Sequence, residues 1–161
     1  MSRREAFEQT VLPHSRGLYA FIRHLNRRDC DDVYQEALLA AWEGFESLRD
    51  PEALRPWLYR IARFKAMDAY RRRYRRDERE EAWPEELPEA GFEGHSALRL
   101  DLDQALSTLR EEDRALLYLV YNQGFNYRMA GQALDIPEGT VKSRVFALKR
   151  RLKELMADKE G

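Results

Sequence analysis

Residues 54–76 place the strongest constraint on the fold. They predict one helix whose first turns have an apolar face to bury and whose last turns must stay in solvent. At 3.6 residues per turn, the apolar side chains of this stretch gather on one face. After Tyr70 that face is lost, since arginines follow in every direction. The first turns can therefore pack on a core, whereas the last turns cannot. The predicted apolar face consists of Leu54, Trp57, Leu58, Ile61, Ala62, Phe64 and Ala69.

The same stretch is strongly basic. It carries nine Lys and Arg residues against a single acid, Asp68, with aromatic residues between them. Cations that bind phosphates and rings that stack on bases make this pattern typical of a nucleic-acid surface. The alternative is an ordinary solvated helix end, because runs of charge are usually solvated faces.

Charge is segregated along the chain, although the net charge over 161 residues is only −1. Residues 29–54 contain eight acids and one base, and residues 77–99 contain eight acids and two bases. Residues 142–153 contain six bases and no acid. This pattern indicates two basic surfaces separated by an acidic spacer.

Composition narrows the class of protein. Hydrophobic residues make up 43% and charged residues 35%, which predicts a soluble globular chain able to bury a core. The single Cys30 excludes an intramolecular disulfide and fits a reducing cytoplasm. No apolar run approaches a membrane span, so we expect a cytoplasmic protein without membrane insertion. Three scattered histidines offer no metal-ligand or nucleophile spacing, so neither an enzyme nor a cofactor is expected.

The N-terminal part predicts a helical domain over residues 1–76. A helix over 3–28 is expected to kink or break at Pro13. Asp29 is placed to cap a second helix that runs to Trp42, and a connecting loop covers 44–53. Within the long basic helix, Trp57 is assigned to the core.

Helical periodicity fails between residues 77 and 96, where prolines, glycines and acids predict a flexible linker over 77–97. A second domain, 98–161, follows. Asn126 is expected to cap a short helix over 127–134, and a turn leads to a long helix over about 138–156. This arrangement predicts a helix-turn-helix. The fold class is therefore all-α, with two small helical domains joined by an acidic flexible linker.

The long last helix has a core-facing and a solvent-facing side. Its inward stripe is predicted to be Val141, Val145, Leu148, Leu152 and Leu155. Small, polar and basic residues occupy the outer side, as a helix that reads a major groove requires. A structural helical hairpin would show the same inward stripe. The outer residues and flanks are Thr140, Lys142, Ser143, Arg144, Phe146, Ala147, Lys149, Arg150 and Arg151.

Two stretches resemble a known family. The run DCDDVYQEALLAAW with LRPWLYRIARFKAMDAYRRR resembles region two of the bacterial sigma factors. The run LREEDRALLYLVYNQGFNYRMAGQALDIPEGTVKSRVFALKRRLKEL resembles region four. Both regions in this order, with no third domain between them, are similar to the small extracytoplasmic-function (ECF) sigma factors. The resemblance covers nearly the whole chain outside the linker.

The resemblance implies a transcription initiation factor that binds core RNA polymerase, directs it to promoter DNA and melts the minus-ten element. It also implies an anti-sigma factor as a partner and no catalytic centre or cofactor. The helix over 29–42 is expected to dock on the polymerase clamp through Asp32, Gln35 and Glu36.

The family's roles also assign DNA contacts. The loop after that helix would capture a flipped base, and the basic helix would line the melted strand. The residues assigned to the minus-ten element are Glu46, Ser47, Leu48, Arg49, Arg55, Tyr59, Arg60 and Arg63. Those assigned to the minus-thirty-five element are Thr140, Lys142, Ser143, Arg144, Phe146, Lys149 and Arg150.

Six residues depart from the family pattern. Phe64 and Lys65 stand where an asparagine and an apolar residue are common, Ala130 replaces a bulky aliphatic residue, and Phe146 stands where a polar or basic residue is usual. The other two are Gly131 and Asp135. Gly131 stands where an alanine is usual, and a glycine inside a helix is expected to cost roughly 1 kcal/mol. Asp135 stands where the turn usually has glycine, so a left-handed backbone conformation with some strain is expected there.

Other readings of the chain stay open. An autonomous helix-turn-helix regulator explains the second half but leaves residues 29–76 without a purpose. An adaptor that only sequesters an anti-sigma factor would usually carry a receiver domain and needs no basic helix.

Overall fold

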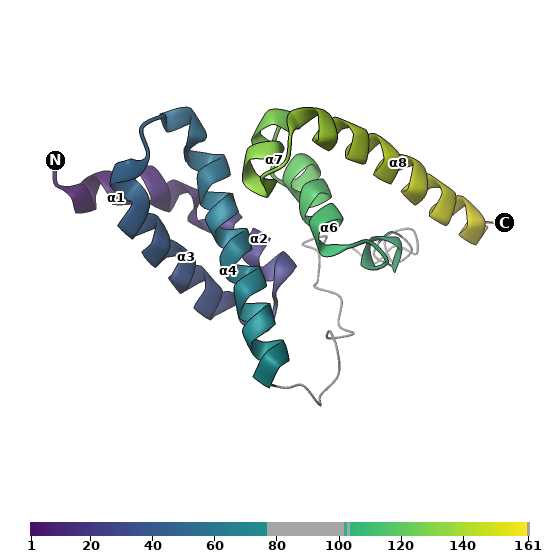
Figure 1. Ribbon diagram of the computed structural model, residues 1–161, viewed down its shortest axis with the longest axis horizontal. Coiled ribbons are helices and arrows are strands. Elements are labelled where there is room, and N and C mark those ends of the chain that lie inside the picture. Colours follow the sequence, from purple (N-terminus) through teal and green to yellow (C-terminus); the bar gives the residue numbers. More distant parts are fainter. Residues whose placement is uncertain (77–101, 103, 161) are drawn as a thin grey trace. The chain divides into compact units, whose positions relative to one another are not determined.

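The computed structural model describes residues 1–76, 102 and 104–160, and every regular element within them is helical (Figure 1). These residues fall into two compact units, so the prediction of two helical domains is confirmed. The predicted acidic linker lies outside the described residues. None of the helices in the described ranges has both the length and the apolar character needed to cross a bilayer.

Within residues 1–76, the N-terminal unit contains four α-helices. Pro13 lies in the short 3₁₀ turn η1 (Leu12–His14) between the first two, so the predicted break at that residue is confirmed. The predicted loop after the third helix contains two further 3₁₀ turns, η2 (Phe45–Ser47) and η3 (Pro51–Ala53). The four helices are α1 (Arg3–Val11), α2 (Ser15–Leu25), α3 (Cys30–Gly44) and α4 (Leu54–Arg76).

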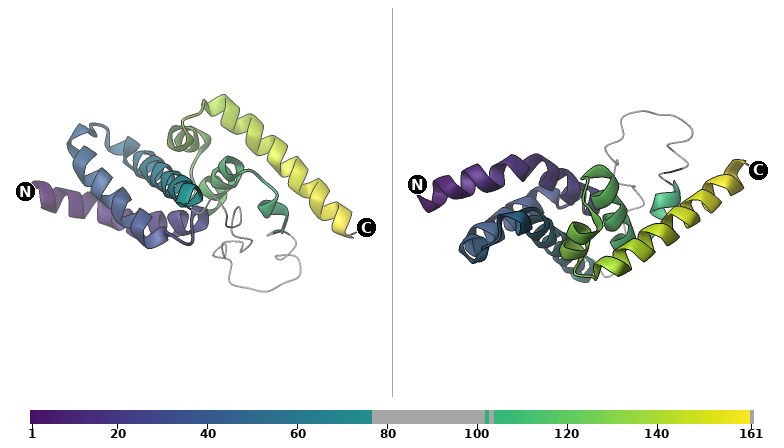
Figure 2. Two further views of the ribbon diagram at one scale, coloured as in Figure 1. Left: turned by 60° about the horizontal axis from the view of Figure 1, so that its bottom comes forward. Right: turned by 90° about the horizontal axis from the view of Figure 1, so that it is seen from above.

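Helix α4 packs between α2 and α3, which also contact each other (Figure 2). Its buried side is Leu54, Leu58, Tyr59, Ala62 and Ala66, and Tyr59 lies against Phe21 with ring centroids 5.1 Å apart. The predicted apolar face was therefore partly wrong. Phe64 points away from this side and is 59% exposed.

The burial of Trp57 is intermediate between that of the buried residues of α4 and that of exposed Phe64. Trp57 is half-buried, and its indole covers Gly44 so closely that a Cβ built there would lie 3.1 Å from Trp57 Cζ2. The end of α3 therefore provides the packing surface for this ring.

A polar network ties the start of α3 to the last turns of α4. Arg73 donates from Nε to Asp29 Oδ2 at 3.1 Å and from Nη2 to Asp29 Oδ1. Asn26 Nδ2 donates to the carbonyl of Ala66 at 3.2 Å, and Asn26 Oδ1 accepts from the Asp29 amide at 3.1 Å. Asp29 occupies the N-cap position, but its carboxylate makes no cap hydrogen bond. The predicted capping role was wrong because Arg73 holds that carboxylate instead.

The C-terminal unit contains the predicted helix-turn-helix. Asn126 accepts a hydrogen bond from the Met129 amide at 2.8 Å, which confirms its predicted capping role. Val141, Val145 and Leu148 of the last helix are buried, and Leu152 and Leu155 are half-buried. The elements are α6 (Glu111–Leu117), a π-helical turn η4 (Tyr118–Asn122), α7 (Tyr127–Leu134) and α8 (Glu138–Glu160).

The turn between α7 and α8 depends on Gly131. Asp135 adopts the expected left-handed conformation, with φ 59° and ψ 46°. This reversal lets the Asp135 and Ile136 amides both donate to the Gly131 carbonyl, the latter at 2.9 Å. A Cβ at Gly131 would lie only 2.6 Å from the Ile136 carbonyl oxygen. The expectation that this glycine simply weakens the helix was therefore wrong, because the tight turn leaves no room for a side chain.

We expect Gly131→Ala to lower the stability of the C-terminal unit by about 1–3 kcal/mol, since backbone must move to admit the methyl group. Gly139→Ala is the matched control. No atom lies within 4 Å of its added Cβ, so it should stabilise α8 by roughly 0.5–1 kcal/mol. Hydrogen exchange of the α7 and α8 amides measures the change in stability of both variants. Equal protection gained by the two variants would contradict the steric argument.

Acid should weaken the N-terminal unit through Asp29. The Arg73 guanidinium is the main cause that holds the pKa of Asp29 below its usual value. A carboxyl whose pKa is lower in the folded chain stabilises the fold above its unfolded pKa of about 4, and this contribution is lost as the pH falls through the folded pKa. We therefore expect the free energy of unfolding to decline below about pH 5, and less steeply in Asp29→Asn.

Urea titrations at a series of pH values, followed by tryptophan fluorescence, to which Trp42 and Trp57 of this unit contribute, measure this decline. Asp32→Asn controls for the removal of one acid from α3, because Asp32 is exposed. The same pH slope in wild type and Asp29→Asn would show that the pair with Arg73 does not carry the effect.

Candidate nucleic-acid and protein interfaces

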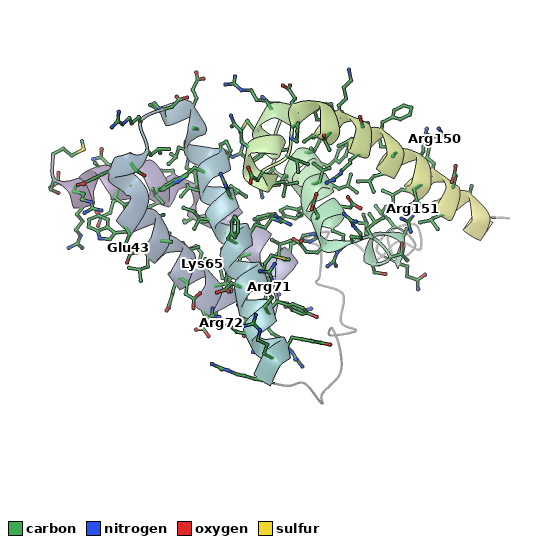
Figure 3. The ribbon with its side chains drawn as sticks, in the orientation of Figure 1. Glu43, Lys65, Arg71, Arg72, Arg150 and Arg151 are labelled. Carbon is green, nitrogen blue, oxygen red and sulfur yellow. The ribbon has the colours of Figure 1, made fainter. Side chains whose placement is uncertain are left out.

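The exposed side of α3 carries the residues predicted to bind polymerase. Asp32 and Gln35 are exposed and Glu36 is half-buried, and their spacing places them on one face of the helix. The structure adds a contact that the sequence did not reveal: Arg72 Nη2 lies 3.1 Å from Glu36 Oε2, and Arg72 Nε lies 3.5 Å from Asp68 Oδ2. The negative charge of Glu36 is thus partly neutralised by Arg72 of α4, which is labelled in Figure 3.

A polar cavity of about 300 Å³ lies along this seam between α3 and α4. Its lining mixes acids of α3 with arginines of α4, so it has no single sign of charge. The lining residues are Asp29, Asp32, Val33, Glu36, Ala69, Arg72, Arg73 and Arg76.

The basic helix α4 presents cations and two exposed rings, Phe64 and Tyr74. The guanidinium of Arg60 lies 6.0 Å from the ring centroid of Phe64, and Arg63 is half-buried. Tyr59 was predicted to contact DNA, but only 1% of its surface is exposed, so its ring belongs to the core. The Arg55 guanidinium lies 6.0 Å from that ring.

Phe64 is the aromatic residue that sequence reasoning assigned to the wrong side. Its position on the helix, opposite Leu58 and Ala62, was the signal that could have identified it as exposed.

The loop after α3 forms one side of a second cavity, of about 390 Å³. Three of the residues predicted to contact the minus-ten element, Glu46, Leu48 and Arg49, line it together. Ser47 does not line it, and its hydroxyl donates to the Gly44 carbonyl at 2.6 Å. The lining also includes Arg3 and Thr10 of α1, which sequence reasoning missed because they lie about 40 residues away in the chain.

Helix α8 presents most of its predicted DNA-facing residues to solvent. Lys142, Ser143, Lys149 and Arg150 are exposed and Thr140 is half-buried, and Figure 3 marks Arg150 and its neighbour Arg151 along the helix. Lys149 Nζ lies 5.5 Å from the ring centroid of Tyr121, an exposed residue of the π-helical turn.

Phe146 is 65% exposed on the same helix. Its ring is therefore not part of the core of the C-terminal unit. Arg144 is placed differently from the other predicted contacts. It forms an ion pair with Glu112 in the first turn of α6, so it braces α8 from the side.

These surfaces offer charged and aromatic groups that can bind a partner. No group of three or more His, Cys, Asp or Glu side chains in the described ranges is arranged to hold a metal ion. Cations beside exposed rings can bind phosphates and stack on bases, and an acidic helix face can bind a protein partner.

Comparison with known proteins covers most of the chain. The family model "Sigma-70 region 2" matches residues 10–76, and "Sigma-70, region 4" matches residues 99–152. The ECF RNA polymerase sigma factor SigM of Mycobacterium tuberculosis is 33% identical over 157 residues, which cover 95% of this chain and 78% of the relative. SigL of the same species is 36% identical over 133 residues, or 78% of this chain and 75% of that protein.

Two solved structures have a similar fold. The sigma factor RpoE in complex with the anti-sigma factor NepR from Bartonella quintana matches with a TM-score of 0.78 and 28% identity, covering 95% of this chain and 98% of that one. CnrH, in complex with the cytosolic domain of CnrY, matches with a TM-score of 0.67 and 25% identity, covering 96% and 90%. With both sigma regions matched in order on two helical units, the chain belongs to the ECF RNA polymerase sigma factors.

Proposed function

We propose that this sigma factor divides promoter recognition among three of its surfaces. The exposed side of α3 binds core RNA polymerase, α4 with the loop over 45–53 binds the minus-ten element, and α8 reads the minus-thirty-five element. The observation that carries the proposal is that each unit presents a cationic helix with an exposed phenylalanine beside its cations. Sigma factors are non-enzymatic initiation factors, and the proposal gives no residue a catalytic role.

Single-stranded DNA is the proposed ligand of α4. Aromatic rings bind unpaired bases by stacking, and neighbouring cations hold the backbone phosphates. Phe64 takes the stacking role that the sequence assigned to Tyr59, because Phe64 is exposed beside Arg60 and Tyr59 is buried. Arg55, Arg60 and Arg63 supply positive charge along this helix.

Duplex DNA is the proposed ligand of α8. A helix that enters the major groove needs small or polar groups at base edges and cations at the phosphates. Ser143 and Phe146 are exposed on the outer side of α8, and Lys142, Lys149 and Arg150 surround them. Arg144 acts indirectly, since its ion pair with Glu112 fixes α8 against α6.

The partners follow from the same surfaces. Core polymerase meets α3, and an anti-sigma factor is the proposed regulator, by analogy with the relative whose structure contains NepR. With these partners, the proposed working place of the protein is the cytoplasm. Run-off transcription with purified core polymerase tests the function directly: promoter-specific transcripts that need the added chain support it. Binding of duplex DNA without such transcripts would favour an autonomous helix-turn-helix regulator.

Charge reversal at Asp32 and Glu36 should weaken binding to core polymerase by about tenfold or more, because complementary charges across an interface would become repulsive. Fluorescence anisotropy with labelled sigma factor and purified core polymerase measures the affinity. Unchanged affinity would contradict the proposal that the exposed side of α3 binds core polymerase.

Arg72→Gln is the matched control for this experiment. It breaks the same ion pair between α4 and Glu36 but leaves the acids of α3 in place. We expect it to retain binding to core polymerase, so a loss equal to that of the double reversal would mean that the ion pair, rather than the α3 surface, was being measured.

Phe146→Ala should leave stability within roughly 0.5 kcal/mol of wild type, since the ring is exposed. If the ring rests on a thymine methyl group, the variant should lose about 1–3 kcal/mol of discrimination at one position of the minus-thirty-five element. Binding to a panel of single-base promoter variants measures this. Large destabilisation with unchanged sequence preference would instead identify a packing residue.

Arg150→Ala should affect DNA binding in a different way from Phe146→Ala. Removing a cation that contacts phosphate should weaken binding to all sequences alike and flatten the salt dependence, whereas Phe146→Ala should leave the salt dependence unchanged.

A further inference from the structure

Arg3 of α1 holds the loop after α3 through three contacts. Its Nη2 donates to the Trp42 carbonyl at 2.5 Å, and its guanidinium carbon lies 4.4 Å from the centroid of the Trp42 rings. Its Nε lies 3.5 Å from Glu46 Oε1. A single guanidinium thus joins the last turn of α3 to the 3₁₀ turn η2.

The rest of α1 supports the same contact. Phe7 packs edge-on against Trp42 and Phe45, with ring centroids 5.3 and 5.4 Å apart and interplanar angles of 90° and 87°. Phe7 and Val11 are buried, so α1 is anchored independently of Arg3. Because α1 is held in place by these buried residues, the guanidinium of Arg3 can fix the position of the loop.

The cavity of about 390 Å³ lies where these parts meet. Arg3 and Thr10 contribute its wall from α1, and Glu46, Leu48 and Arg49 contribute from the loop. Arg3 is linked to Glu46 across this lining, and together with the packing of Phe7 on Phe45 this contact holds the turn η2 against α1. The width of the cavity therefore depends on a residue outside the loop itself.

We infer that Arg3 is a positioning residue for base discrimination in the minus-ten element, and that it acts by fixing Glu46 and the turn η2 at the width of the cavity. The inference rests on the proposed function, in which this loop receives an unpaired base. Discrimination at that base depends on fit, and a cavity with a loosened wall accepts bases of different size and hydrogen-bonding pattern.

A purely structural role would have different consequences. Exposed ion pairs and cation–π contacts contribute little to stability, and the side chain of Arg3 is 39% exposed. Removing it should leave the fold intact and change the position of the turn. A general loss of stability would instead affect every promoter position alike.

Arg4 provides the matched control. It is the next residue of the same helix, its side chain is 81% exposed, and its Nε pairs with Glu8 Oε1 at 2.9 Å on α1 itself. Arg4→Ala removes the same charge from the same helix without touching the cavity.

The experiment uses the full chain with purified core polymerase and promoter templates selected from randomised DNA by the wild-type holoenzyme. Each minus-ten and minus-thirty-five position is then randomised, and sequencing of the transcripts gives the base preference at each position. Arg3→Ala should lose up to about tenfold in discrimination at one minus-ten position, because a displaced turn no longer fits one base better than another. Its minus-thirty-five preferences, its affinity for core polymerase and its thermal unfolding should match wild type and Arg4→Ala.

Two further variants test how Arg3 acts. Arg3→Lys keeps a cation over Trp42 but loses the planar fork, so it should restore part of the discrimination. In a Glu46→Ala background, Arg3→Ala should cause little further loss, because the two residues act through one contact. Full additivity of the two losses would overturn a role through Glu46.

The possible failures are distinguishable. An unchanged minus-ten preference in Arg3→Ala, or an equal loss at every position, would overturn the inference and leave the proposed function standing. Absence of promoter-specific transcripts with the wild-type chain would overturn the proposed function, and the inference with it.

Discussion

The burial of one side of α4 between α2 and α3 is the constraint on which the N-terminal unit depends. A helix is a stiff rod, so the core contacts of Leu58, Tyr59 and Ala62 also fix the direction of the turns beyond them. Those turns carry the arginines, and two of them reach back to α3 through Asp29 and Glu36. The apolar burial thus places positive charge where a strand of nucleic acid can meet it, and the polar contacts keep the end of the rod from separating.

In the C-terminal unit, the short turn between α7 and α8 fixes the direction of the last helix. The left-handed Asp135 reverses the chain, and the missing side chain at Gly131 lets the Ile136 carbonyl approach the backbone of α7. The buried stripe of Val141, Val145 and Leu148 then sets the rotation of α8 about its own axis, which leaves Phe146 and its basic neighbours outside. The orientation of α8 follows from this steric limit and this packing.

The basic residues of this protein fall into two groups, those paired with acids of neighbouring helices and those exposed to solvent. The sequence alone does not distinguish the two groups. Arg72, Arg73 and Arg144 are engaged with carboxylates of neighbouring helices, so they brace the fold. Exposed cations such as Lys142 and Arg150 are available to a ligand. A run of arginines predicts a basic surface, but which of its members bind a partner depends on whether an acid lies within reach. Arg3 shows the same dependence, because its place beside the loop is set by the packing of Phe7 on Trp42 and Phe45.

The sequence by itself determined the helices, the two-unit organisation and the family. Periodicity located α4 over residues 54–76, Asn126 marked the start of α7, and the matching runs indicated sigma regions two and four. These features are local or depend on recognisable residue patterns, so neighbouring residues suffice to reveal them. Only the tertiary structure decided that Tyr59 is buried, that Asp29 binds Arg73 in place of capping α3, and that Gly131 is required by the turn. The physical reason is common to all three: each outcome depends on atoms from a segment that the local sequence does not contain, or on a turn whose closeness only the folded backbone defines.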